Sequence, residues 1–274
     1  MLFKEDILMM SWLTIGVILG LVQGITEFLP VSSTGHLIIV AKFLHFTGSK
    51  ASVFEVAVQL GSIMAVVVIY WNRFIGLIRP EKNKKFAGLY GIWLLFLTTL
   101  PPGIIGFLFH SYIKTLFTIP SVIAALTTGS IFMLISEQLC RNISQRIVTL
   151  DELTPKTALG IGFFECLALW PGFSRSAATI MGGMLLGAKR HLAAEYSFIA
   201  AVPVMFAATG YDLLKNWDLF TANDLPLFIT GMICAFLAAW ITIKVFILLI
   251  SKISLRPFAY YRLLLAFIVY LCIK

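Results

Sequence analysis

Long apolar stretches constrain this chain most, because six of them are long enough to cross a lipid bilayer as helices. They cover residues 53–72, 87–109, 117–139, 193–214, 226–250 and 258–273, the last of which is short. A bilayer core requires about 20 apolar residues in a helix. With 59% hydrophobic and 12% charged residues, the 274-residue chain is too apolar for a soluble domain. The sequence predicts an all-α polytopic membrane protein.

Two further apolar regions are interrupted by short polar strings. Region 8–45 contains a proline followed by three hydroxyl residues at 30–34, and region 157–188 contains a similar string at 171–176. A proline ends a helix, and a hydroxyl-rich turn can start the next one. Each half is then short, which favours a re-entrant helical hairpin, although residues 8–29 alone are long enough to span. We therefore expect six transmembrane helices plus two re-entrant hairpins.

The order of elements repeats, with one hairpin and three spans in each of two pseudo-repeats, 8–139 and 157–273. Three pairs of residues align at offsets of 140 or 141: Pro30 with Pro171, Ser33 with Ser174, and Glu55 with Glu195. Because three spans are an odd number, the second half must enter the membrane from the opposite side. This predicts an inverted repeat within a single domain, 1–274, an architecture that many transporters use.

Lysine and arginine residues divide unequally between the two predicted sides. The net charge of +8 is typical of cytoplasmic loops and indicates no nucleic-acid partner. One side carries twelve: Arg73, Arg79, Lys82, Lys84, Lys85, Arg141, Arg146, Lys156, Lys189, Arg190, Lys252 and Arg256. The other carries six: Lys4, Lys42, Lys50, Lys114, Lys215 and Lys274. The first side is therefore expected in the cytoplasm, with both termini and the mouth of the first hairpin outside.

The first polar string is rich in reactive groups. Glu27 precedes Pro30 by three residues, so it can point at the turn that carries Ser32 and Ser33. Hydrocarbon penalises ionisable groups, which makes a carboxylate here a functional candidate. The alternative is a carboxylate bonded to amides at the helix end. His36 lies three residues after Ser33, on the same helical face, and can move protons near neutral pH. Its alternative is a purely structural histidine.

The second string adds a positive charge. Arg175 is expected to be the only arginine deep in an apolar region, where an isolated guanidinium needs an anionic partner. Helix N-termini attract anions, and each hairpin would offer one, at residues 32–34 and 174–176. Two such termini and one arginine predict a phosphate or diphosphate site. The alternative is that Arg175 pairs only with Glu27 or Glu165.

These strings carry a family resemblance. The string from Gln23 to His36, the string from Leu167 to Ser176 and the run 54–62 resemble the undecaprenyl-diphosphatase family, the bacitracin-resistance phosphatases of bacteria. The resemblance spans nearly the whole chain. It implies a hydrolase in the bacterial plasma membrane that converts undecaprenyl diphosphate to undecaprenyl phosphate and inorganic phosphate, recycling the lipid carrier for peptidoglycan synthesis. Its partners would be that substrate and membrane lipids; a homodimer is left open.

The resemblance also implies site residues. By motif position, Glu27, Ser33, His36 and Arg175 match the family's catalytic residues, and a divalent metal, magnesium or calcium, would bind at Glu27. The expected substrate-binding residues are Gln23, Ser32, Thr34, Glu165, Ser174 and Ser176. Two positions depart from the pattern: Gln23 stands where some members have an acid, and Glu165 where Gln is frequent. We hypothesise that Glu165 supplies the displaced negative charge or balances Arg175.

Three chemical routes stay open at this stage. Ser33 could be the nucleophile with His36 as base, His36 could be the nucleophile oriented by Ser33, or a metal could activate water. A different class of function is also open, because inverted repeats and broken helices occur in transporters. A lipid-carrier flippase or anion transporter would need the anion site but no histidine beside Ser33.

Overall fold

The computed structural model describes residues 12–79, 84–215 and 224–273, and its elements in these ranges are helices apart from one isolated bridge between Ile147 and Ala188. The helices are α2 (Trp12–Thr26), α3 (Ser33–Phe43), α4 (Ser49–Ile69), α5 (Trp71–Ile78), α6 (Gly88–Leu108), α7 (His110–Thr115), α8 (Ile119–Leu139), η1 (Leu150–Glu152), α9 (Pro155–Glu165), η2 (Cys166–Leu169), α10 (Arg175–Leu185), α11 (Arg190–Lys215), α12 (Leu225–Ile250) and α13 (Arg256–Ile273).

Five of the described helices are long and apolar enough to cross a membrane: α4, α6, α8, α11 and α12. Each coincides with a stretch expected from the sequence, with ends displaced by at most four residues. The prediction of an all-α, multi-pass membrane protein is thereby confirmed. α13 forms over the sixth expected stretch, but it has 18 residues and includes Arg256 and Arg262. It is not among the five, so a sixth span stays a prediction.

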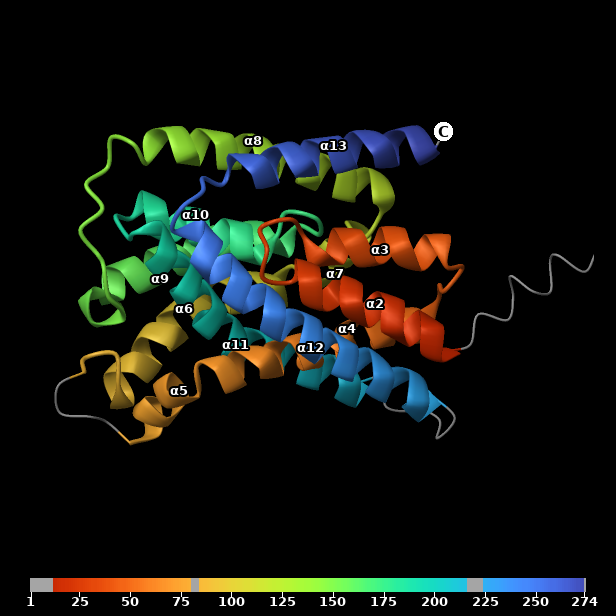
Figure 1. The fold of residues 1–274 in the computed structure, drawn as a ribbon, viewed down its shortest axis with the longest axis horizontal. Coiled ribbons are helices and arrows are strands. Elements are labelled where there is room, and N and C mark those ends of the chain that lie inside the picture. Colours follow the sequence, from red (N-terminus) through yellow and green to blue (C-terminus); the bar gives the residue numbers. More distant parts are fainter. Residues whose placement is uncertain (1–11, 80–83, 216–223, 274) are drawn as a thin grey trace, which may run out of the picture.

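Each interrupted region folds into two short helices joined by a turn. In Figure 1, α2 and α3 approach the centre from one end of the molecule, and α9 and α10 approach from the other. The two turns meet there: the Ser176 hydroxyl donates a hydrogen bond of 2.9 Å to the backbone carbonyl of Leu29. The breaks expected at Pro30 and Pro171 therefore bring two distant parts of the chain together.

Serines start the second helix of both pairs in the same way. Ser32 (φ 73°) accepts from the Gly35 amide, and Ser174 (φ 78°) accepts from the Ala177 amide. A positive φ is rare outside glycine, so the shared conformation marks these two caps as equivalent. They lie 142 residues apart, whereas the prolines lie 141 apart. The second turn is thus one residue longer, and the expected alignment of Ser33 with Ser174 is off by one.

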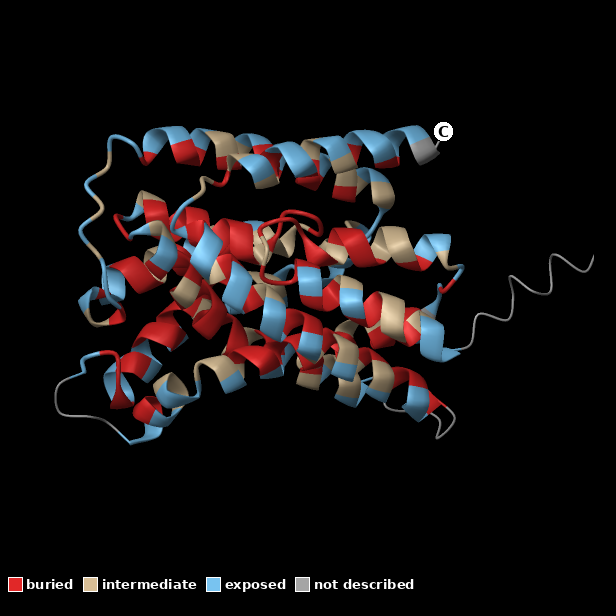
Figure 2. Cartoon of the chain, viewed as in Figure 1, coloured by how far each residue is buried: buried red, intermediate tan, exposed pale blue. Residues whose placement is uncertain are grey.

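The helices that carry the turns are held by close packing. Gly16, Gly20 and Gly24 face α12, and a Cβ added at Gly20 would lie 2.4 Å from the carbonyl oxygen of Gly231. Glycines at this spacing let two apolar helices touch through their backbones. Figure 2 shows the result: buried residues surround the central turns, whereas the outer faces of the long helices are largely exposed. The turns themselves are largely buried.

Candidate active site

A cavity of about 140 Å³ lies where the two turns meet. It could hold a few water molecules at about 30 Å³ each, or a small polar group. Its lining comes from both turns and from two long helices: Glu27, Ser32, Ser33, Thr34, Gln59, Ala168, Pro171, Gly172, Ser174, Arg175 and Met205. Six of the residues expected from the sequence therefore share one cavity, although they come from opposite ends of the fold.

Glu27 is the centre of the hydrogen-bond network beside this cavity. Its side chain is buried, with one oxygen accepting from the Ser33 hydroxyl at 2.5 Å and from the Gln23 amide at 2.9 Å. The other oxygen accepts from Arg175 Nη2 at 3.1 Å. The Glu27 amide donates to the Gln23 carbonyl, continuing the turn of α2, and this places the two side chains on one face. Three donors thus fix the carboxylate.

Arg175 is the first residue of α10 and reaches across to the first turn. Nη2 binds Glu27, and Nη1 donates to the Ser197 carbonyl at 3.2 Å. The pairing with Glu27 that the sequence analysis kept as an alternative is therefore present. Within the described residues no ion pair joins Arg175 to Glu165. Because the guanidinium also lines the cavity, an anion that enters can compete with Glu27 for it.

His36 has partners other than Ser33. Its Nδ1 lies 2.7 Å from the Ser32 carbonyl, and its Nε2 lies 2.7 Å from the Tyr261 hydroxyl. A carbonyl only accepts, so Nδ1 carries the proton and Nε2 of the neutral ring accepts from Tyr261. The two rings are nearly parallel, with centroids 5.7 Å apart. His36 does not line the cavity, and within the described residues its ring is hydrogen-bonded to Ser32 and Tyr261 and not to Ser33.

The remaining expected binding residues divide into two groups. Ser32, Thr34 and Ser174 line the cavity, whereas Ser176 points to the Leu29 carbonyl and to the Ser174 hydroxyl. Two others are not among the residues that line the cavity: Gln23 is fully buried on α2, and Glu165 is buried at the end of α9. Gln23 Oε1 and Glu165 Oε2 have no hydrogen-bond partner among the described residues.

Arg262 corrects the expectation that Arg175 is the only arginine in an apolar region. It lies on α13 and is 0% exposed. Its guanidinium donates to the carbonyls of Pro30 and Gly172, one in each turn, at 3.4 and 3.2 Å, and to that of Ala125 at 3.3 Å. Arg262 therefore ties both turns to α8. The sequence does show an arginine inside an apolar stretch, but no local pattern indicates that backbone carbonyls accept its hydrogen bonds.

The oxygen donors at Glu27 fit a hard divalent cation. The carboxylate of Glu27, the unpartnered amide oxygen of Gln23 and the Ser33 hydroxyl lie within one network. Magnesium and calcium prefer such oxygens and accept others from phosphates. Within the described residues no group of three or more His, Cys, Asp or Glu side chains forms a cage for a metal ion. An ion here would combine one carboxylate with neutral oxygens.

Comparisons with known proteins show the family of this chain. The family described as "Bacitracin resistance protein BacA" matches residues 16–268. A protein named undecaprenyl-diphosphatase from Nitratidesulfovibrio vulgaris is 63% identical over 95% of this chain and 98% of its own length. Proteins of the same name from Maridesulfovibrio salexigens and Desulfovibrio desulfuricans are 61% and 59% identical, over 94% and 95% of this chain and 97% and 98% of theirs. The chain belongs to the BacA family of bacitracin resistance proteins.

Proposed function

We propose that this protein is an undecaprenyl-diphosphate phosphatase, which hydrolyses the lipid diphosphate to undecaprenyl phosphate and inorganic phosphate. The relatives named undecaprenyl-diphosphatase match nearly the full chain at 53–63% identity. One observation of the site carries the proposal: a serine hydroxyl, its carboxylate acceptor and an arginine meet in a cavity between two helix N-termini. The product returns the carrier to peptidoglycan synthesis, and loss of the diphosphate removes the target of bacitracin.

Substrate binding would use the positive groups that converge on the cavity. The first-turn amides of α3 and α10 have no intrahelical acceptors, and the two helix dipoles add positive potential. Arg175 offers a planar fork that suits phosphate oxygens. When the diphosphate enters, the guanidinium exchanges Glu27 for phosphate. Glu27 then keeps its contact with Ser33, which is the contact that the chemistry needs.

The geometry favours Ser33 as the nucleophile and Glu27 as its base. The Ser33 oxygen attacks the terminal phosphorus, its proton passes to Glu27, and the bond from that phosphorus to the bridging oxygen breaks, so undecaprenyl phosphate leaves. Water then attacks the phosphoserine; Glu27 returns the proton to the serine oxygen, and inorganic phosphate leaves. His36 positions the turn by holding the Ser32 carbonyl. A divalent ion, magnesium or calcium, held by Glu27 and Gln23, would supply charge neutralisation for the phosphates.

The arrangement in the membrane is proposed as an inverted repeat with two re-entrant hairpins. Two matching contacts support it: α2 packs on α12, and α9 packs on α6. Since α6 and α12 hold the same place in their halves, this exchange of partners is what a pseudo-two-fold axis produces. We place the protein in the bacterial plasma membrane with the site opening outward, following the charge asymmetry of the loops.

Phosphate release from a C55 lipid diphosphate by purified protein tests the activity, with and without a chelator. Ser33→Ala should lower the rate by orders of magnitude, whereas Ser130→Ala, which removes a buried hydroxyl of α8 bonded to its own helix, should not. Phosphate trapped on the protein should be acid-stable and map to Ser33. An acid-labile adduct on His36 would assign the nucleophile there instead. Lipid movement without phosphate release would favour the flippase or transporter alternative.

A further inference from the structure

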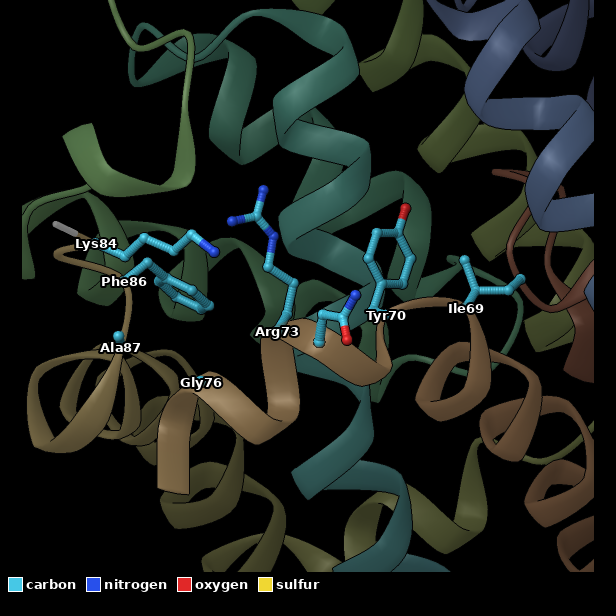
Figure 3. A pocket seen from close by; sticks show the side chains of 8 residues that line it. Ile69, Tyr70, Arg73, Gly76, Lys84, Phe86 and Ala87 are labelled. Atoms are coloured by element: carbon cyan, nitrogen blue, oxygen red, sulfur yellow. The ribbon is translucent and has the colours of Figure 1, made fainter. Parts of the chain in front are cut away.

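A second polar cavity lies away from the hairpin turns, beside the bend between α4 and α5. Its volume is about 390 Å³, and it shares no lining residue with the cavity at Glu27. The lining residues are Ile69, Tyr70, Asn72, Arg73, Gly76, Lys84, Phe86 and Ala87. Figure 3 shows that the side chains of Arg73 and Lys84 extend into the same space from two different segments. The cavity is therefore cationic.

Among the described residues, Arg73 has one weak side-chain partner. Its Nη2 lies 3.5 Å from Glu195 Oε1, and its side chain keeps 36% exposure. This distance is at the limit of a hydrogen bond, and a phosphate oxygen can offer a shorter one. Lys84 is exposed beside it, and the Asn72 amide adds a donor. Two cations and an amide around an open cavity suit a monoanionic phosphate group.

Two apolar hollows lie further along α6, which begins just after the lining residues Phe86 and Ala87. The first, of about 350 Å³, lies between Phe74 and Leu77 of α5, the 92–99 segment of α6, and Val202 and Pro203 of α11. Val202 follows Glu195 by seven residues, so this hollow lies about 10 Å further along α11 on the same face. A second hollow of about 420 Å³ shares Phe96 and Thr99 and extends to Leu108. The Thr99 hydroxyl is already bonded to the Leu95 carbonyl, which leaves the surface apolar.

Exposed amphipathic aromatics occur close in the chain to the residues that line the polar end. Trp71, Tyr90 and Trp93 have exposures of 56%, 39% and 49%. Tryptophan and tyrosine gather at the level of lipid headgroups, because the ring is apolar and its polar edge can reach water. An anionic headgroup at this polar end would lie near these aromatics, with the hollows further along α6 beside its acyl chain.

We propose that this cavity and the hollows along α6 form a binding site for an anionic phospholipid of the surrounding leaflet. The headgroup phosphate binds between Arg73 and Lys84, and an acyl chain lies along α6 toward Leu108. Charge complementarity selects an anionic over a zwitterionic headgroup, since a choline cation would meet the same two positive side chains. The site is separate from the one at Glu27 and does not depend on the proposed hydrolysis.

Native mass spectrometry of the full-length protein in detergent tests this directly. Phosphatidylglycerol should bind with at least tenfold higher affinity than phosphatidylcholine of the same chains. Lys84→Gln and Arg73→Gln should each weaken phosphatidylglycerol binding by about tenfold, the loss expected for one charge-assisted hydrogen bond. The matched control is Arg146→Gln. Arg146 is an exposed loop arginine that donates to the Ser144 hydroxyl. Equal effects of all three substitutions would mean general charge attraction and would overturn the site.

Filling the cavity tests it without removing charge. A Cβ added at Gly76 meets no atom within 4 Å, so Gly76→Leu should fold normally and block the headgroup. Gly210→Leu, at another glycine with open space but outside the three cavities, should bind phosphatidylglycerol like the parent protein. Unchanged binding in Gly76→Leu would overturn the proposal. So would competition by inorganic phosphate at concentrations equal to those of the lipid, because the site would then recognise a free anion and not a lipid.

Discussion

At the residue scale, the site depends on one carboxylate that joins the serine to the arginine. Glu27 accepts the Ser33 hydroxyl at 2.5 Å and the Arg175 guanidinium at 3.1 Å. A serine in a membrane interior is a poor nucleophile unless a base takes its proton, and Glu27, the carboxylate in contact with it, is the base that we propose. The same carboxylate binds the Arg175 guanidinium until a phosphate competes for it. Binding and activation are thus linked through Glu27.

This linkage predicts that Glu27 and Ser33 act as one unit. Glu27→Gln keeps the shape but cannot take the proton, so we expect the rate of phosphate release to fall by about 10²- to 10⁴-fold. Ser33→Ala should fall at least as far. The double variant should be little slower than the slower single one, because each removes the same step. Losses that simply multiply would show that the two residues act independently.

Arg175 gives a second prediction at this scale. Arg175→Lys keeps the charge and loses the fork that spans Glu27 and the Ser197 carbonyl. We expect turnover to fall by at least about tenfold, because one charge-assisted hydrogen bond is lost. Thermal unfolding in detergent should show that the variant is still folded. Near-normal activity in Arg175→Ala would show that Arg175 has no role in binding the diphosphate.

At the element scale, α13 acts as a clamp on the two turns. Arg262 donates to carbonyls of both, and Gly129 on α8 leaves the room, since a Cβ there would lie 2.3 Å from Arg262 Nη2. The turns carry Ser33 and Arg175, so a shift of either would separate the nucleophile from the phosphate. Misplacement by about 1 Å can cost about 100-fold in rate.

We therefore expect Arg262→Lys to lower kcat by about 100-fold while KM changes little, because the lysine ammonium cannot reach three carbonyls at once. A purely stabilising role would instead lower the unfolding temperature and leave kcat of the folded fraction unchanged. Arg256→Lys is the matched control at the start of the same helix, where the arginine contacts the Gln138 side chain and not the turns. It should keep both kcat and stability.

The contact of α2 with α12 gives a prediction about stability. Alanine is favoured over glycine inside helices by about 1 kcal/mol, so a glycine-to-alanine change is normally harmless there. At Gly20 the added Cβ would lie 2.4 Å from the Gly231 carbonyl oxygen, and the helices would have to separate. Gly20→Ala should lower the thermal unfolding temperature, whereas Gly103→Ala, with no atom within 4 Å, should not. Equal temperatures would mean that α2 can shift without cost.

The sequence predicts the elements well because their causes are local. Apolar length set the long helices, and Pro30 and Pro171 marked the two turns. The break at Tyr70, where α4 ends and α5 begins, was missed, since apolar residues continue through it. In the site, Ser33 and Glu27 are six residues apart and their contact was within reach of spacing arguments. The side-chain partner of His36, Tyr261, lies 225 residues away on α13, and no local pattern could identify it.

At the scale of the whole molecule, the second helices of the two hairpins, α3 and α10, begin near one point and are approached from opposite ends of the molecule (Figure 1). Two opposed hairpins add their helix dipoles at the centre, where a diphosphate lipid would bring its charge. In the proposed inverted repeat, each hairpin opens toward one side of the membrane only. The first hairpin carries Ser33 and Glu27, so the side on which it opens decides from which side the lipid diphosphate is hydrolysed.

Cysteine labelling in intact cells tests that orientation. Lys114 lies on the side expected outside and Arg146 on the side expected in the cytoplasm, and both are exposed. In a background free of Cys140, Cys166, Cys234 and Cys272, a membrane-impermeant thiol reagent should modify Lys114→Cys and spare Arg146→Cys until the membrane is opened. Because the topology expected from the sequence puts twelve basic residues on the Arg146 side and six on the other, the positive-inside rule gives this direction. The reverse labelling would turn the first hairpin toward the cytoplasm, so that Ser33 and Glu27 would meet diphosphate lipid from the inner leaflet.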